Sequence, residues 1–99
     1  MYKKPLAIAG FACLALSGMA GAADIHTRTI ASTCMSCHGP GGMSQGTIPS
    51  LAGMDPDYFV RLMQGFKTGT RPATIMQRHA SGYTDAEIAA MATYFSTLK

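Results

Sequence analysis

The sequence predicts an all-α domain, and three observations support this. Between residues 59 and 66 the apolar side chains recur at helical spacing, at Phe59, Leu62, Met63 and Phe66. Thr84 and Glu87 have the T-x-x-E spacing of a capping box, which marks the start of a helix. No segment shows the alternation of apolar and polar residues that is typical of a half-buried strand.

The first 23 residues have the pattern of a secretory signal peptide. Lys3 and Lys4 precede an uncharged run over residues 6–20, and small residues follow up to Ala23. A basic start, an apolar core and a small-residue site predict export to the periplasm, with cleavage near Ala22 or Ala23. Because a membrane span needs roughly 20 apolar residues, a retained anchor is the weaker interpretation. The mature domain is then expected to cover residues 24–99 without a membrane span.

This mature domain is small and nearly neutral. Of the eight Lys and Arg residues, Lys3 and Lys4 leave with the signal, so six basic residues face five acidic ones. Such a balance gives no argument for a nucleic-acid partner. A domain of this size buries little apolar surface, so it often depends on disulfides, a metal or a cofactor.

The expected elements follow in chain order. A short helix over residues 25–33 has Asp24 as its cap, although its threonines are weak helix formers. Residues 39–53 contain five glycines and two prolines and are expected to form a loop. A second helix starts with Asp55 as N-cap and Pro56 at its first position, and it stops near Gly69. A second loop over residues 68–83 holds at most one short helix after Pro72. The last helix runs from the capping box to the C-terminus, with Ile88, Met91, Phe95 and Leu98 on one face.

The stretch C-M-S-C-H at residues 34–38 carries the chemistry of the chain, and several sites use parts of it. A thioredoxin-like dithiol sits beside a βαβ pattern, which is not present in this sequence. Zinc requires four ligands, and no second C-x-x-C accompanies this one. A disulfide between Cys34 and Cys37 would close a loop too short to stabilise the fold much.

A covalently attached haem c accounts for every one of these features. C-x-x-C-H is the attachment sequence of c-type haem: the thiols of Cys34 and Cys37 bind the porphyrin, and the imidazole of His38 reaches the iron. The apolar ring would also supply the core that two long loops cannot provide. One haem c is therefore expected between the helices.

Met76 is the expected second axial ligand of the iron. It lies in the second loop, with 37 residues between it and His38, which is enough chain to reach the opposite face of the ring. Met54 and His79 are the alternatives, whereas Met63 and Met91 lie on apolar helix faces and are expected to fill the core. The backbone carbonyl of Pro49 is the expected hydrogen-bond acceptor for the ring of His38.

The chain resembles a small class I cytochrome c over nearly all of the mature sequence. The resemblance rests on CMSCHG, IPSLAG, YFVRLMQGFKTG and EIAAMATYFSTL. It implies three core helices around one haem and the aromatic pair Tyr94 and Phe95 where the first and last helices cross. Independently of this resemblance, Leu51 is expected to pack against the haem edge, since it follows Pro49 closely. The motifs M-D-P, G-F-K-x-G, T-I-M-x-R and G-Y also resemble the haem domain of the cytochrome subunit of flavocytochrome c sulfide dehydrogenases. That family places its distal methionine at Met76, but its better-known cytochrome subunits carry two haem domains.

The expected function is therefore periplasmic electron transfer. With His38 and Met76 both bound to the iron, the chain itself is not expected to catalyse bond chemistry, and a thioether ligand raises the reduction potential. The resemblance implies an FAD-bearing sulfide dehydrogenase subunit as electron donor and a further acceptor such as another cytochrome c. The alternatives are a free-standing shuttle between respiratory complexes and a metal-binding or redox-sensing protein. Three apolar residues, Met43, Ile48 and Ile75, are candidates for the contact surface.

Overall fold

The computed structural model describes residues 23–99, which contain helices and no strand. The elements are α1 (Ile25–His38), the short 3-10 helix η2 (Pro40–Gly42), α2 (Pro56–Thr68), α3 (Met76–Ser81) and α4 (Asp85–Ser96). The predicted all-α class is thus confirmed for this part of the chain. None of these helices is long and apolar enough to cross a membrane. The predicted signal peptide lies outside the described residues, apart from Ala23.

The predicted helix starts are confirmed by their caps. The Asp24 carboxylate accepts a hydrogen bond from the Thr27 amide at 2.7 Å. Asp55 caps α2 in the same way, with Pro56 at the first helical position. At α4 both hydrogen bonds of the capping box between Thr84 and Glu87 are present. These bonds satisfy amide groups that the first helical turn leaves without partners.

Two expected boundaries were wrong. The first helix does not stop at Thr33 but continues to His38, and the hydroxyls of Thr29, Ser32 and Thr33 donate to carbonyls of the preceding turn. Half-buried side chains of this extension, Cys34 and Met35, also pack against the core. The last helix ends at Ser96 instead of running to the C-terminus.

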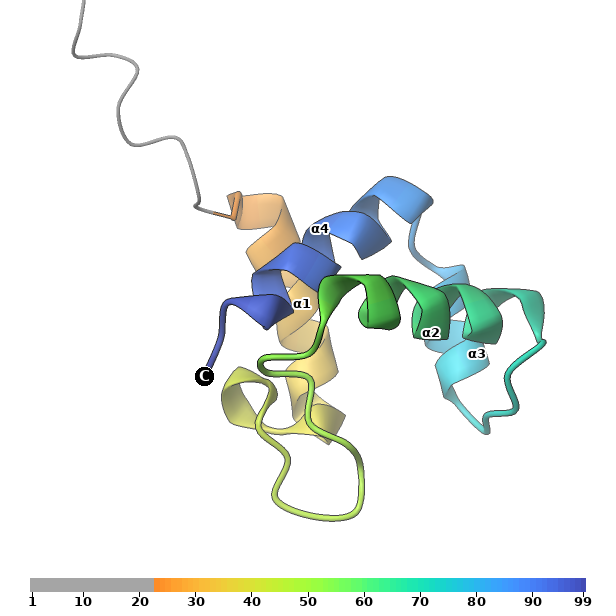
Figure 1. Cartoon of the computed structure of the whole chain (residues 1–99), viewed down its shortest axis with the longest axis horizontal. Coiled ribbons are helices and arrows are strands. Elements are labelled where there is room, and N and C mark those ends of the chain that lie inside the picture. Colours follow the sequence, from red (N-terminus) through yellow and green to blue (C-terminus); the bar gives the residue numbers. More distant parts are fainter. Residues whose placement is uncertain (1–22) are drawn as a thin grey trace, which may run out of the picture.

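The core lies where α1, α2 and α4 meet. Figure 1 shows α1 and α4 crossing, with α2 starting beside the crossing and running away from it, and α3 beneath the far end of α2. Ala31 of α1 and Ala92 of α4 are 0% and 1% exposed, so small side chains allow a close approach of the two helices. Phe95 is fully buried there and stacks on Phe59 of α2, with ring centroids 5.8 Å apart. The three core helices of the sequence prediction are therefore present.

Two ion pairs at the surface connect the helices. Lys67 at the end of α2 lies 3.1 Å from Asp85 at the start of α4. His26 in the first turn of α1 lies 2.7 Å from Glu87 in the first turn of α4. Hydrogen bonds from Gln64 and Lys67 keep the pKa of Asp85 below its ordinary value. Exposed pairs of this kind add little stability individually, but they fix where α4 begins relative to α1 and α2.

Candidate functional site

The last turn of α1 carries three of the predicted site residues. Cys34, Cys37 and His38 are separated by three and four positions, so they lie on neighbouring turns of one helix face. Both cysteines are free thiols, Cys34 half-buried and Cys37 exposed. Burial raises the pKa of the Cys34 thiol above its ordinary value, which keeps it protonated at neutral pH. The helix that extends to His38, which the sequence did not predict, is what brings these three side chains together.

The ring of His38 is held by one hydrogen bond. Its Nδ1 lies 2.6 Å from the carbonyl oxygen of Pro49. A carbonyl can only accept, so Nδ1 must be the protonated nitrogen. In the neutral imidazole this leaves the lone pair of Nε2 free for a metal. A histidine that binds a metal through one ring nitrogen usually donates a hydrogen bond of this type through the other.

The turn at residues 39–42 brings Pro49 to His38. The Gly42 carbonyl accepts hydrogen bonds from the amides of Leu51 and Ala52, at 2.7 and 3.0 Å. Gly42 has a φ of +81°, and a Cβ atom there would come within 3.1 Å of the Phe95 ring. The loop is thus anchored on α4, and Leu51 is buried in the core.

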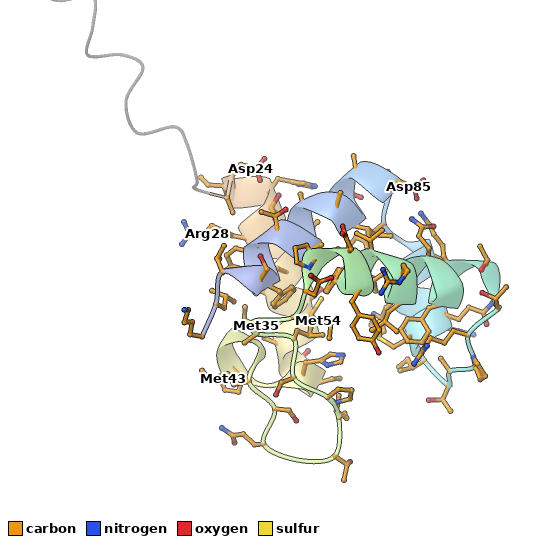
Figure 2. All side chains as sticks on the ribbon, viewed as in Figure 1. Asp24, Arg28, Met35, Met43, Met54 and Asp85 are labelled. Carbon is orange, nitrogen blue, oxygen red and sulfur yellow. The ribbon has the colours of Figure 1, made fainter. Side chains whose placement is uncertain are left out.

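The candidates for the opposite ligand lie in other segments. Met76 is the first residue of α3, and it is half-buried against the core, as is Met54 just before α2. Figure 2 shows Met54 where the loop over residues 43–53 returns toward α2, and Met43 beside η2 at the start of that loop. His79, one turn after Met76, is exposed. Met63 and Met91 are 5% and 0% exposed, which confirms them as core residues.

Four large apolar side chains around these segments remain exposed. Met43, Ile48, Tyr58 and Ile75 are 42–53% exposed, and they lie on the two loops and on α2. Surface of this kind is what a broad apolar ligand would cover. No group of three or more His, Cys, Asp or Glu side chains within residues 23–99 is arranged to hold a metal ion, so this part of the chain gives no support to zinc.

Comparison with protein families decides among the remaining site types. Residues 21–95 match the family described as cytochrome c oxidase, cbb3-type, subunit III. The chain belongs to this family of c-type cytochrome domains. Membership implies a haem c held through cysteine, and it makes electron transfer the role of the domain.

Known relatives and a solved structure agree with the family. The cytochrome is 46% identical over 66 residues to the cytochrome subunit of sulfide dehydrogenase from Chlorobaculum tepidum, which covers 67% of this chain and 60% of the relative. It is 38% identical over 94 residues to the thiosulfate dehydrogenase electron acceptor of Stutzerimonas stutzeri, covering 86% of this chain and 44% of the relative. The structure of cytochrome c4 from Acidithiobacillus ferrooxidans superposes with a TM-score of 0.67 at 28% identity, over 80% of this chain and 53% of that chain. The cytochrome thus spans about half the length of these proteins.

The side chains of the cytochrome fit a c-type haem. Two thiols stand on one helix face, an imidazole beside them presents Nε2, and thioethers are available at residues 54 and 76. This donor set has the soft sulfur and imidazole ligands of a haem iron.

Two residues that the sequence did not single out also shape the site. Gly42 holds the loop that carries Pro49, as described above. The Tyr83 hydroxyl lies 3.0 Å from the Thr33 hydroxyl, which joins the α3–α4 connection to the turn before Cys34. The glycine-rich letters of residues 39–42 indicated a loop, but nothing in them showed which glycine would meet Phe95.

Proposed function

We propose that this cytochrome carries one haem c and accepts single electrons from the flavoprotein subunit of a sulfide dehydrogenase. Residues 1–23 are proposed as its signal peptide and the periplasm as its location. The observation that supports the haem site most directly is the 2.6 Å hydrogen bond from His38 to Pro49, which leaves Nε2 free for a metal on the helix turn that also carries Cys37. The identity with the cytochrome subunit of a sulfide dehydrogenase supports the partner.

Each site residue has its own task in this proposal. Cys34 and Cys37 would hold the porphyrin by thioether bonds, and His38 and Met76 would be the axial ligands. A haem bound in this way supplies one-electron chemistry between Fe(III) and Fe(II). Pro49 keeps the His38 ring in one orientation, and Leu51 excludes water from that side. With His38 and Met76 both holding the iron, sulfide would have no ligand position on it, so sulfide oxidation would belong to the partner.

The first experiment determines whether the haem is present. The protein is purified from the periplasm of a cell that makes c-type cytochromes, and a reduced pyridine adduct is recorded. We expect one c-type haem per chain, and a C34S/C37S double variant should lose the covalent haem. A wild-type protein without a c-type band would contradict the proposal and leave the metal-binding or redox-sensing alternative.

The second experiment identifies the electron donor. The cytochrome is mixed with an FAD-containing sulfide dehydrogenase subunit, and haem reduction is followed after sulfide is added. We expect reduction only when both sulfide and the flavoprotein are present, together with a stable complex that contains flavin and haem. A flavin-free monomer that the flavoprotein does not reduce would exclude this partner. The free-standing shuttle is the second candidate, and the similarity to the electron acceptor of thiosulfate dehydrogenase supports it.

A further inference from the structure

One side-chain hydrogen bond joins the helix that carries the cysteines to the segment that carries Met76. The hydroxyl oxygens of Tyr83 and Thr33 lie 3.0 Å apart. The Thr33 hydroxyl already donates its one hydrogen to the Ile30 carbonyl at 2.7 Å, so it can only accept from Tyr83. The Tyr83 hydroxyl is therefore the donor. In the part of the chain that the structure describes, no other hydrogen bond links α1 to residues 70–83.

The two ends of this hydrogen bond are close in sequence to the proposed haem-binding residues. On α1, Thr33 directly precedes Cys34 and lies one turn before Cys37 on the same helix face. On the other side, Met76 is the first residue of α3, and Tyr83 follows the end of this helix by two positions, in the connection to α4 (Figure 1). The hydrogen bond thus connects the element that starts with Met76 to the turn that precedes the attachment cysteines.

The C-terminal end of α3 is the end that the core holds. Ala80 is fully buried, and the half-buried Tyr83 side chain packs against the core. The Tyr83 amide also donates to the Ala80 carbonyl at 3.3 Å. By contrast, residues 72–75 before α3 are all exposed. Because a helix this short moves as a unit, the position of Met76 depends on how firmly residues 80–83 are fastened.

We propose that Tyr83 is a positioning residue for the Met76 thioether, and that its hydrogen bond to Thr33 slows the departure of this ligand from the haem iron. The inference rests on the function proposed above, in which His38 and Met76 are the axial ligands. A ligand that replaces the sulfur needs room at the iron, and a movement of α3 away from α1 would provide it. The hydrogen bond opposes this movement, because its two partners lie on the two parts that separate. It therefore stabilises the state in which Met76 is bound.

Tyr83→Phe and Thr33→Val test this proposal in the intact ferric cytochrome, since each removes one partner of the hydrogen bond and nearly keeps the shape of the side chain. Imidazole is the probe: it replaces a thioether on ferric haem, and the sulfur-to-iron charge-transfer band disappears as it binds. At high imidazole concentration the observed rate reaches a limit, which is the rate at which the sulfur leaves. We expect each variant to raise this limiting rate about two- to tenfold, the factor that one ordinary hydrogen bond gives.

Three further variants serve as controls. Tyr94→Phe is the matched control, because Tyr94 is also half-buried against the core but takes no part in this hydrogen bond. It should exchange its ligand at the wild-type rate. Thr33→Ser keeps the accepting hydroxyl and should do the same. A T33V/Y83F double variant should be no faster than either single variant, because both substitutions remove the same interaction.

The outcomes separate this inference from the function on which it rests. A pyridine adduct without c-type haem, or a charge-transfer band that survives Met76→Ala, would overturn the proposed ligation and the inference with it. A haem-loaded Tyr83→Phe variant that exchanges at the rate of Tyr94→Phe would overturn the inference alone. This holds even if the variant unfolds more easily in guanidinium chloride, since a merely structural hydrogen bond would have only that effect.

Two features keep the test decisive. Additive effects in the T33V/Y83F variant would also overturn the inference, because the two hydroxyls would then act independently. If Tyr83→Phe does not mature, the comparison of Thr33→Val with Thr33→Ser decides in the same way from the other partner. Ligand exchange is measured without the flavoprotein, so the result does not depend on which protein donates the electron.

Discussion

Gly42→Ala should destabilise this cytochrome more than Gly41→Ala, although both glycines have positive φ angles. Gly41 has a φ of +64° with nothing within 4 Å of an added Cβ atom, whereas Gly42 has a φ of +81°. At Gly42 the added atom would lie 3.1 Å from both the Ala52 amide nitrogen and the Phe95 ring. The two sites therefore share the backbone cost and differ in crowding.

The expected magnitudes follow from these two contributions. A left-handed conformation costs an alanine about 1–2 kcal/mol, which is the whole effect at Gly41. Overpacking in a well-packed core adds about 1–3 kcal/mol, so Gly42→Ala should cost about 2–5 kcal/mol. Since the Gly42 carbonyl also holds Leu51 and Ala52, part of this loss should appear as weaker protection of the loop that carries Pro49.

Unfolding in guanidinium chloride, followed by circular dichroism, measures both variants. Phe95→Leu shortens the ring that meets residue 42, so a G42A/F95L double variant should recover part of the crowding cost. We expect a favourable coupling of about 0.5–3 kcal/mol between the two sites. Equal costs at Gly41 and Gly42, or a coupling of zero, would refute the argument that contact with Phe95 anchors this loop.

Two other predictions concern the iron ligand and pH. Met76→Ala should abolish the sulfur-to-iron charge-transfer band of the oxidised protein and lower its reduction potential. Met54→Ala is the matched control and should leave the band in place. If Met54→Ala abolishes the band and Met76→Ala does not, Met54 is the ligand. The hydrogen bond from the Thr84 amide, together with His26, holds the pKa of Glu87 below its ordinary value of 4.5. The ionised Glu87 carboxylate therefore stabilises the fold fully above pH 4.5, and this stabilisation is lost as the pH falls through the lowered pKa. The free energy of unfolding of the wild type should therefore exceed that of Glu87→Gln at neutral pH and approach it in acid. A difference that stays constant with pH would exclude the ionised Glu87 carboxylate as the source of this stability.

The sequence predicted what depends on local chemistry. The caps at Asp24, Asp55 and Thr84 were read from neighbouring residues, because a capping side chain bonds to amides within three positions. The buried positions Phe59 and Phe95 followed from helical spacing in the same way. The prediction that the Pro49 carbonyl faces His38 came from the need of a metal-binding imidazole for an acceptor, and this hydrogen bond is present.

The length of α1 could not be predicted because tertiary contacts decide it. Helix propensity alone argued for an end at Thr33, since threonine and serine are weak helix formers. In the folded chain Cys34 and Met35 pack against the core, and the hydroxyls bond within the helix, so the helix continues to His38. The contact between Gly42 and Phe95 could not be predicted from the sequence for a similar reason, since it joins residues that are 53 positions apart.

The distribution of burial explains why such a small chain depends on its site. The crossing of α1 and α4 is complete without a ligand, because Ala31, Ala92 and Phe95 are fully or almost fully buried. The loop and the connection that carry Met43, Ile48 and Ile75 are different, since these side chains remain about half exposed. They cannot gain the burial free energy of a core residue from the protein alone. A haem held by the end of α1 and by Met76, as proposed, would offer these side chains an apolar surface, so it would stabilise the part of the fold that the helices leave exposed. Met76 would then both bind the iron and belong to a segment that the haem stabilises, whereas Cys34, Cys37 and His38 lie on a helix that packs without it.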